Sequence, residues 1–205
     1  PAMGGFPEKL VQIMDDLVAD PVLSVPTPLD GEVWGEAPYL VASRAYTARA
    51  QAEFLGTNDA SPPVTVSVAS PPESWRRRDQ LDAMAHRLIA AWRGGAERVL
   101  MPMQTRDEGF QPAMFAWATL GPALEGRSFE GELHASETAT CLVADGQHGM
   151  LVVAWSDQLN TSERIELPLG TERVTVESMD GRSWSVASSD GVHALDLTST
   201  PIIVR

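Results

Sequence analysis

The spacing of apolar residues changes at the segment Leu124-Glu125-Gly126-Arg127-Ser128-Phe129. Before it, apolar residues recur every three or four positions, which is the period of a helix with one buried face. After it, apolar and polar residues alternate in short segments, which is the period of half-buried strands. The pattern predicts an α/β domain at residues 6–126 and an antiparallel β-sandwich domain at residues 127–205.

The first part alternates predicted helices with predicted strands. Helical spacing closed by glycine or proline predicts helices at residues 7–19, 37–55, 77–93 and 113–124. Short apolar runs between them predict strands at residues 22–25, 64–68 and 98–101. Because strands joined by crossover helices run parallel, this order predicts a parallel sheet.

The second part is divided by turn residues. The pairs Asp145-Gly146, Asp180-Gly181 and Asp190-Gly191 are typical of hairpin turns, and Asp157 to Asn160 indicates a fourth turn. The alternating segments between the turns predict eight strands, enough for an antiparallel sandwich. These are Phe129–Leu133, Thr138–Ala144, Met150–Trp155, Arg164–Leu167, Arg173–Glu177, Ser183–Val186, Val192–Leu197 and Ile202–Val204.

The composition excludes several classes of protein. The 205 residues are 43% hydrophobic and 21% charged, which is typical of a globular chain, and no apolar run reaches the roughly 20 residues of a membrane span. The formal charge of -13, with Arg76-Arg77-Arg78 as the one basic run, argues against a nucleic-acid partner. Residues 1–5, which begin Pro1-Ala2-Met3-Gly4, are interpreted as a cloning remnant, so they carry no information on the compartment.

Metal, cofactor and thiol chemistry are not indicated. The residues His86, His134, His148 and His193 are scattered without metal-ligand spacing, and the chain has neither a Gly-rich phosphate loop nor a Gly-x-Ser-x-Gly motif. We therefore expect no metal site and no cofactor. Cys141 lies in an apolar strand pattern, which predicts a small core residue.

Four segments together carry a resemblance to a known family. They are the helix Met84–Trp92 closed by Gly94-Gly95-Ala96, the strand Arg98–Met103, the segment Gln111–Leu120 leading to Gly126, and the sandwich strands Leu151–Ser156 and Thr200–Val204. The stretch resembles the end of a clan-A glycoside hydrolase, in which a (β/α)8 barrel is followed by a small β-sandwich. The resemblance implies that the first part is a partial barrel-like layer, formed by the last three βα units.

The resemblance also implies where a retaining glycosidase would hold its two carboxyl groups, which lie about 5 Å apart in such enzymes. The acid/base follows the fourth barrel strand, to which no strand here corresponds. The nucleophile follows the seventh, which maps onto residues 64–68, but Ala69 and Ser70 stand where a glutamate is expected. Glu73 is therefore the catalytic candidate, with Trp75 as a sugar-stacking platform. Alternatively, both belong to the start of the next helix, where a negative charge is favourable.

Further substrate-binding candidates follow the other predicted strands. Asp107 and Glu108 come after the third strand, and Trp34 and Glu36, near Glu32, come after the first. Barrel enzymes place their functional loops at the carboxyl ends of the strands, so these residues are candidates for contacts with a sugar. The alternative is an ordinary solvated loop in each case.

Two functions remain open. The first is a glycoside-hydrolase-like carbohydrate-active protein, present as a fragment or degenerate relative and not catalytic by itself; the second is a non-enzymatic interaction module. An extracytoplasmic location would follow from the first. Because three parallel strands cannot close a barrel, the open sheet edges predict a homo-oligomer or a partner chain.

Overall fold

The computed structural model describes residues 22–23, 65–68, 71, 75–100, 112–158 and 161–205. The chain divides into two compact units, of which the first comprises Pro1–Ala69 with Ala90–Met103 and the second comprises Ser70–Ile89 with Gln104–Arg205. The helices predicted at residues 7–19 and 37–55 lie outside the described residues. The predicted domain boundary at residues 126 and 127 stays a prediction.

The first unit contains a three-stranded parallel sheet. Its strands are β1 (Val22–Leu23), β2 (Thr65–Ser67) and β3 (Arg98–Leu100), in the order β1-β2-β3. Val66 of β2 pairs with Leu23 on one side and with Val99 on the other. The parallel pairing agrees with the alternation of helix and strand in the sequence.

Two helices are described, and both confirm the sequence-based prediction. Helix α3 (Arg77–Arg93) begins with the bond from the N–H of Gln80 to the carbonyl of Arg76, at 3.0 Å. Helix α4 begins at Pro112, where the missing N–H costs nothing, and ends at Leu124. Gly126 follows with φ +66°, a conformation that glycine adopts readily, so the change of pattern in the sequence coincides with the end of this helix.

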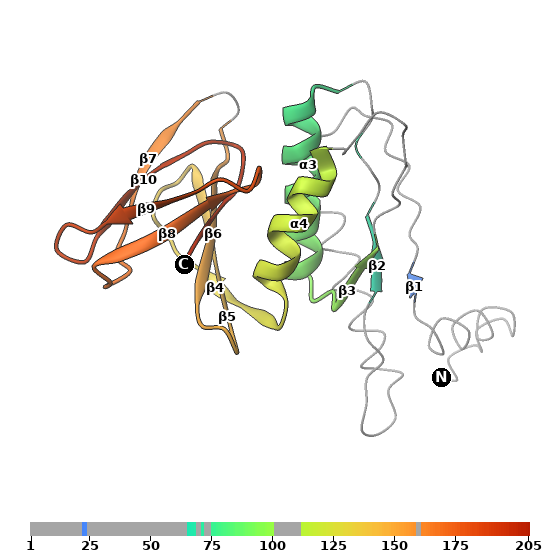
Figure 1. Cartoon of the computed structure of the whole chain (residues 1–205), viewed down its shortest axis with the longest axis horizontal. Helices are drawn as coiled ribbons and strands as arrows, with labels where there is room; N and C mark the ends of the chain where they lie inside the picture. Colours follow the sequence, from blue (N-terminus) through green and yellow to red (C-terminus); the bar gives the residue numbers. More distant parts are fainter. Residues whose placement is uncertain (1–21, 24–64, 69–70, 72–74, 101–111, 159–160) are drawn as a thin grey trace, which may run out of the picture. The chain divides into compact units, whose positions relative to one another are not determined.

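All eight predicted strands of the second part are confirmed, with their ends within two residues of the prediction. A six-stranded antiparallel sheet has the order β4-β5-β6-β11-β8-β9, and β10 pairs with β7 in a second sheet (Figure 1). The strands are β4 (Arg127–Glu132), β5 (Ala139–Gly146), β6 (Leu151–Ser156), β7 (Glu163–Leu167), β8 (Arg173–Ser178), β9 (Ser183–Ala187), β10 (His193–Leu197) and β11 (Ile202–Val204).

Two of the predicted Asp-Gly turns are confirmed and one is displaced. Gly181 has φ +80°, and Asp190 and Gly191 have φ +53° and +81°, so both pairs form tight turns between strands. The pair Asp145-Gly146 instead ends β5, and the turn follows it, closed by a 3.0 Å bond from the N–H of Gly149 to the carbonyl of Gly146. The sequence prediction was wrong here because Gly149, with φ +80°, supplies the conformation that the turn needs.

One face of the six-stranded sheet packs against the two-stranded sheet to form the sandwich core. The buried residues of this core are Ala139, Cys141, Val152, Ala154, Ile165, Leu167, Val174, Val176, Leu195, Leu197, Ile202 and Val204. Apolar residues alternate along β7, β8 and β10 as the strand period requires. The core therefore confirms the expectation that Cys141 is a buried packing residue.

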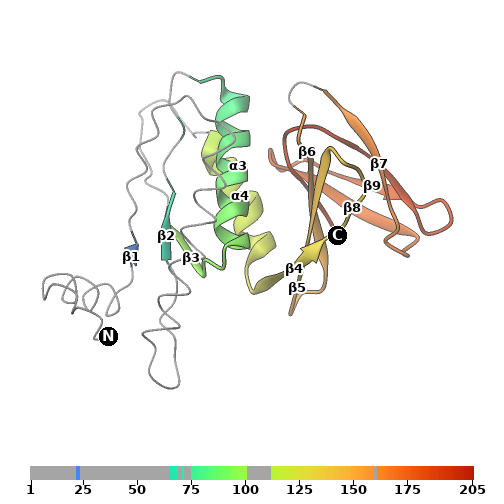
Figure 2. The same cartoon turned by 180° about the vertical axis from the view of Figure 1, so that it is seen from behind.

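The opposite face of the same sheet is buried as well. Leu142, Val153 and Ile203 are neighbours in register on this face, and each is 0% exposed. Figures 1 and 2 show α4 and the first part of α3 lying along it. The hydroxyl of Thr119 on α4 donates to the carbonyl of Met179 in the sandwich, at 3.5 Å. The centre of the sheet is thus covered on both sides within the second unit.

The burial of Cys141 gives a direct chemical prediction. Desolvation, with smaller contributions from Glu132, Glu163 and Asp157, raises the pKa of its thiol to about 11. Because the thiolate is the reactive form, only about one thiol in a thousand is ionised at pH 8. At its ordinary pKa of 9.0 about one thiol in ten is ionised at this pH, so we expect the native chain to react with a thiol reagent about 100-fold more slowly than the chain unfolded in guanidinium. Equal rates in the two states would contradict the burial.

Candidate functional site

The sequence-predicted catalytic candidate and most of the predicted sugar contacts lie outside the described residues. These are Glu73, Trp34, Glu36, Asp107 and Glu108. The strands that precede them are described: β1, β2 and β3 are adjacent and parallel, so the chain leaves all three at the same edge of the sheet. This edge corresponds to the position at which parallel α/β proteins bind their ligands. The roles of the five residues stay predictions.

Trp75 is the predicted sugar contact that the structure describes. It lies half-buried directly before α3. Its carbonyl accepts a 2.8 Å hydrogen bond from the side-chain amide of Gln80, in the first turns of that helix. This bond fixes the main chain of Trp75 relative to α3. The position agrees with packing at a helix start, and its role as a stacking platform stays a prediction.

A polar cluster that sequence reasoning missed lies between α3 and the sandwich in the second unit. We call it the α3–sandwich cluster and define it as Asp82, His86, Trp155 and Ser199. The Nε2–H of His86 donates to the carbonyl of Ser199, at 2.9 Å. The rings of His86 and Trp155 meet edge to face, with centroids 5.1 Å apart and an interplanar angle of 82°. The cluster thus joins the helix to β6 and to the segment before β11.

Asp82 is the acidic member of the cluster and is only 4% exposed. Its Oδ2 accepts a 3.5 Å bond from the hydroxyl of Ser199, while its Oδ1 has no hydrogen-bond partner among the described residues. Burial raises the pKa of Asp82, against the opposing effects of a hydrogen bond with Thr200 and the charges of Arg78 and His86. The carboxyl group is therefore held in an environment that disfavours its charge.

The same environment disfavours the charged form of His86. Burial lowers its pKa, and this effect exceeds the opposing ones of the Ser199 carbonyl and of the Asp82 and Asp157 carboxylates. Its Nε2–H is used by the Ser199 carbonyl, so this nitrogen cannot take a proton from the Ser199 hydroxyl. The cluster therefore lacks the geometry of a nucleophilic triad and serves to hold α3 on the sandwich.

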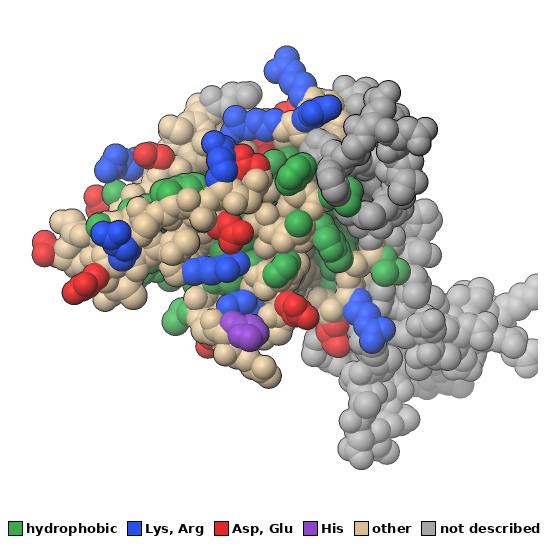
Figure 3. All heavy atoms as spheres, in the orientation of Figure 1, with side chains coloured by type: hydrophobic (Ala, Val, Ile, Leu, Met, Phe, Trp, Pro, Cys, Tyr) green, Lys and Arg blue, Asp and Glu red, His purple; other side chains and the backbone are tan. Residues whose placement is uncertain are grey.

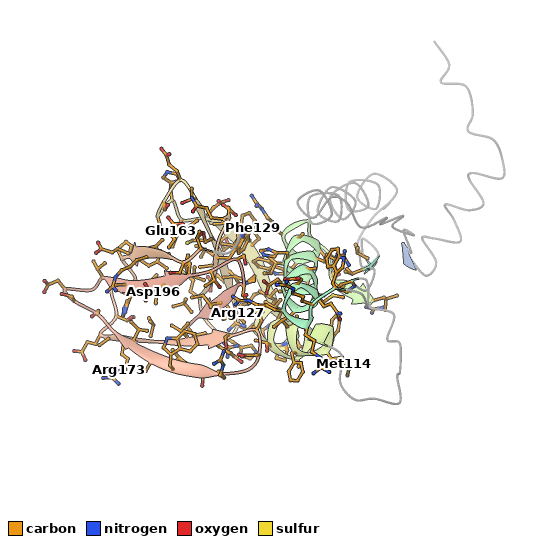
Figure 4. The ribbon with its side chains drawn as sticks, turned by 90° about the horizontal axis from the view of Figure 1, so that it is seen from above. Met114, Arg127, Phe129, Glu163, Arg173 and Asp196 are labelled. Atoms are coloured by element: carbon orange, nitrogen blue, oxygen red, sulfur yellow. The ribbon has the colours of Figure 1, made fainter. Side chains whose placement is uncertain are left out.

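A second polar cluster joins the two sheets of the sandwich. The carboxylate of Glu163, on β7, accepts hydrogen bonds from the hydroxyls of Ser136 and, at 3.3 Å, of Ser156. The Ser136 and Thr138 hydroxyls lower the pKa of Glu163, with a smaller effect of Ser156. Figure 4 shows Glu163 on the two-stranded sheet, which also carries Asp196. A carboxylate whose pKa is lowered in this way is unsuited to donating a proton as a general acid.

The third polar contact secures the junction between α4 and β4. The guanidinium of Arg127 donates to the carbonyl of Ala123 at 2.6 Å, of Gly149 at 2.9 Å and of His148 at 3.0 Å. These bonds satisfy a carbonyl in the last turn of α4, which has no partner within the helix. Arg127 thereby fixes the helix end against the turn between β5 and β6.

The described residues show no metal site, and on one face they carry charges of both signs. Among them, no group of three or more His, Cys, Asp or Glu side chains is placed to hold a metal ion. Figure 3 shows acidic and basic side chains interspersed over the described part of one face. No helix in the described part of the chain is long and apolar enough to cross a membrane.

Comparison with known proteins identifies the type of fold that this chain has. No family model and no curated protein sequence matches the chain. A family 39 glycoside hydrolase from the gut symbiont Bacteroides cellulosilyticus WH2 matches 82% of this chain with a TM-score of 0.60 and 15% identity. A bifunctional glucanase-xylanase from a metagenome library matches 89% with a TM-score of 0.53 and 13% identity. The chain has a glycoside hydrolase-like fold.

A third structure extends the comparison. A family 27 β-L-arabinopyranosidase from Geobacillus stearothermophilus matches 84% of the chain with a TM-score of 0.50 and 9% identity. The chain spans 37% of the first two structures and 42% of this one. At identities of 9–15%, the glycoside hydrolase-like fold is what these likenesses show, and they leave the chemistry to be argued from the residues.

Proposed function

We propose that this chain is the supporting part of a carbohydrate-active protein of glycoside hydrolase type, and that it does not hydrolyse glycosides by itself. The observation that carries the proposal is the match with the family 39 glycoside hydrolase over 82% of the chain. The match is long enough to require residues of both compact units. It therefore extends beyond the β-sandwich.

The arrangement of the first unit supports a partial barrel. Strands β1, β2 and β3 are adjacent in chain order and parallel, as consecutive strands of a (β/α)8 barrel are. Three strands cannot close such a barrel, which needs about eight. We therefore interpret the sheet as a barrel-like layer that requires further strands, from the same polypeptide or from another, before a complete sugar site exists.

In this interpretation the second unit has a supporting role. The α3–sandwich cluster holds α3 on the sandwich, and Arg127 holds the end of α4. These side chains form hydrogen bonds within the fold, and the Nε2–H of His86 donates to the carbonyl of Ser199 and not to its hydroxyl. The chemistry belongs instead to the loops after β1, β2 and β3, where Trp34, Glu36, Glu73, Asp107 and Glu108 are the candidates.

A retaining mechanism assigns these candidates distinct roles. Glu73 would attack the anomeric carbon, and a second carboxyl about 5 Å away would protonate the leaving oxygen and later activate water. Trp34 and Trp75 would stack on sugar rings, while Glu36, Asp107 and Glu108 would accept hydrogen bonds from sugar hydroxyls. The proposal requires the second carboxyl to come from strands other than β1 to β3.

The purified chain is therefore expected to release no nitrophenol from a panel of α- and β-nitrophenyl glycosides above the rate in buffer. The comparison uses the wild-type chain, Glu73→Gln, and Asp79→Asn as a carboxylate control in the first turn of α3. Turnover by the wild type and by Asp79→Asn that disappears in Glu73→Gln would show that the chain holds a complete site. That result would overturn the claim that further strands are needed.

The alternative is a non-enzymatic interaction module, and the uncharged edge strand β9 is the observation that favours it. Titration with soluble xylan and β-glucan oligosaccharides separates the two functions. Binding that is weakened in Trp34→Ala supports the carbohydrate-active protein. Absence of binding by a chain that self-associates supports the module.

A further inference from the structure

Strand β9 is an unprotected edge of the six-stranded sheet. It is the last strand in the order β4-β5-β6-β11-β8-β9, so no strand in the described part of the chain pairs with its outer side. Its sequence is Ser183-Trp184-Ser185-Val186-Ala187, which contains no charged residue, no proline and no glycine. Natural proteins usually protect such edges with charges, prolines or bulges, because an unprotected edge pairs with other chains.

The opposite edge of the same sheet provides a comparison. Strand β4 carries Arg127, Glu130 and Glu132, and its register shifts between Phe129 and Gly131, which marks a bulge or irregularity. Charges and a local irregularity are the two devices that prevent strand addition. One edge of the sheet is therefore protected against pairing, whereas the other is not.

The register of β9 shows which of its main-chain groups are free to pair. The N–H of Ser178 donates to the carbonyl of Arg182 at 2.8 Å, and the N–H of Ser188 donates to that of Glu172 at 2.9 Å. Because hydrogen bonding alternates along an antiparallel pair, the even-numbered residues of β9 face β8. The N–H and carbonyl groups of Ser183 and Ser185 consequently point outward.

The one large apolar side chain of this strand lies between these two serines. Trp184 is 45% exposed, although its partner in register, Val176, is completely buried. Residues opposite each other in a strand pair share a face, so Trp184 extends the sandwich core to the edge of the sheet. Exposed aromatic side chains at a strand edge are typical of pairing surfaces.

We propose that β9 pairs antiparallel with β9 of a second copy of this chain, with Trp184 on the two-fold axis. In this register, Ser183 lies opposite Ser185 of the second copy, and the two serines exchange hydrogen bonds in both directions, which gives four main-chain bonds in all. The two Trp184 residues form the intervening pair, in which side chains are closest and aromatic contacts are favourable. The six-stranded sheet becomes a twelve-stranded sheet across the dimer.

A second copy fits this edge better than a charged partner does. The contact is self-complementary about Trp184, as a two-fold interface must be. It is also a strip without charge on a protein whose formal charge is -13, so pairing of two β9 strands places no like charges opposite each other within the strand. Screening of the remaining repulsion by salt should strengthen the dimer.

The size of the contact predicts a weak dimer. A short strand pair buries less than the roughly 1,200 Å² at the low end of stable interfaces, so a dissociation constant on the order of 100 μM is expected. Sedimentation equilibrium should show monomer at about 1 μM and a growing dimer fraction at several hundred micromolar. The dimer fraction should rise between 50 mM and 500 mM NaCl. A monomer at every concentration and salt would overturn the proposal.

Two variants test the interface in different ways. Trp184→Lys places a charge on the axis. Ser185→Pro removes an outward N–H and leaves the main-chain bonds to β8 in place, although it also removes the 3.3 Å bond from the Ser185 hydroxyl to the carbonyl of Val174. Each should weaken self-association at least 10-fold. Met150→Lys is the matched control, because Met150 is 67% exposed but lies in the turn before β6. Circular dichroism and thermal unfolding establish that each variant is folded. A dimer that survives both β9 variants would overturn the proposal.

The register of the two β9 strands in the proposed dimer can be tested by disulfide cross-linking. The paired positions on the axis have Cα atoms about 4.5 Å apart, within the range of a disulfide. Trp184→Cys should therefore form a covalent dimer under mild oxidation. Ser185→Cys should not, because its copies are offset along the strands by roughly 7–8 Å. Buried Cys141 does not compete. Cross-linking in Ser185→Cys but not in Trp184→Cys would overturn the register. If β9 paired with an unrelated peptide instead of a second copy, neither cysteine variant would form a covalent dimer.

Discussion

Ile203→Ala is expected to lower the free energy of unfolding by about 2–5 kcal/mol, as much as the neighbouring Ile202→Ala. The two residues are adjacent in β11, so their side chains point to opposite faces of the sheet. Ile202 is 8% exposed in the sandwich core, and Ile203 is 0% exposed on the face along which the helices lie. In a sandwich with one solvated face, only one of the two substitutions would be costly.

The comparison requires denaturant unfolding of both variants and of Arg205→Ala. Arg205 follows the same strand and forms a 3.2 Å ion pair with Glu177, but it is largely exposed, so its loss should cost no more than about 1 kcal/mol. If Ile203→Ala cost as little as Arg205→Ala, the helices would not cover this face in solution. A large cost for both isoleucines would support a sheet buried on its two sides.

His86→Ala is expected to cost about 2–4 kcal/mol, because it removes two interactions of the α3–sandwich cluster. The Ser199 carbonyl loses its donor, at a cost of roughly 1–3 kcal/mol, and the edge-to-face contact with Trp155 is worth about 0.5–1.5 kcal/mol. His86→Gln keeps an N–H near the carbonyl and should recover part of the loss. Equal losses in the two variants would contradict the role of the hydrogen bond.

The same residue should make stability depend on pH. Burial lowers the pKa of His86 below 6.5 in the folded chain, so the unfolded chain binds a proton first as the pH falls. The wild type should therefore lose more stability than His86→Gln between pH 7 and pH 5. Asp82 acts in the opposite direction, because its raised pKa lets the folded chain bind a proton first above 3.8. Identical pH profiles for the two proteins would exclude the effect of His86.

The helices, strands and turns could be predicted from the sequence because each depends on residues that are close together in the chain. Helix α3 follows from apolar spacing closed by Gly94 and Gly95, and the turn at Asp190-Gly191 follows from two residues that tolerate positive φ. The order of the strands depends on distant contacts instead. Alternation tells which face a residue occupies, but it does not indicate that β11 lies between β6 and β8. The continuous apolar run Leu151–Trp155 in β6 is the local sequence signal of a strand that is buried on both faces.

The polar clusters were beyond sequence reasoning for the same reason. His86 lies on a helix that the apolar spacing predicts whether or not His86 has a hydrogen-bond partner. Its acceptor, the carbonyl of Ser199, is 113 residues away in the sequence. Glu163 is one acid among 28 Asp and Glu residues until its serine donors are known. The candidate carboxylates after β2 and β3 rest on the positions of strand ends, which the sequence predicted and the parallel sheet supports.

The position of β11 has a consequence for biosynthesis. The pairs β4-β5-β6 and β8-β9 are made earlier, but they become one sheet only when Ile202–Val204 inserts between β6 and β8. A ribosome adds residues in chain order, so the two halves of the sheet stay unjoined until Ile202–Val204 has left the exit tunnel. During that interval the inner edges of β6 and β8 are open to pairing with other nascent chains.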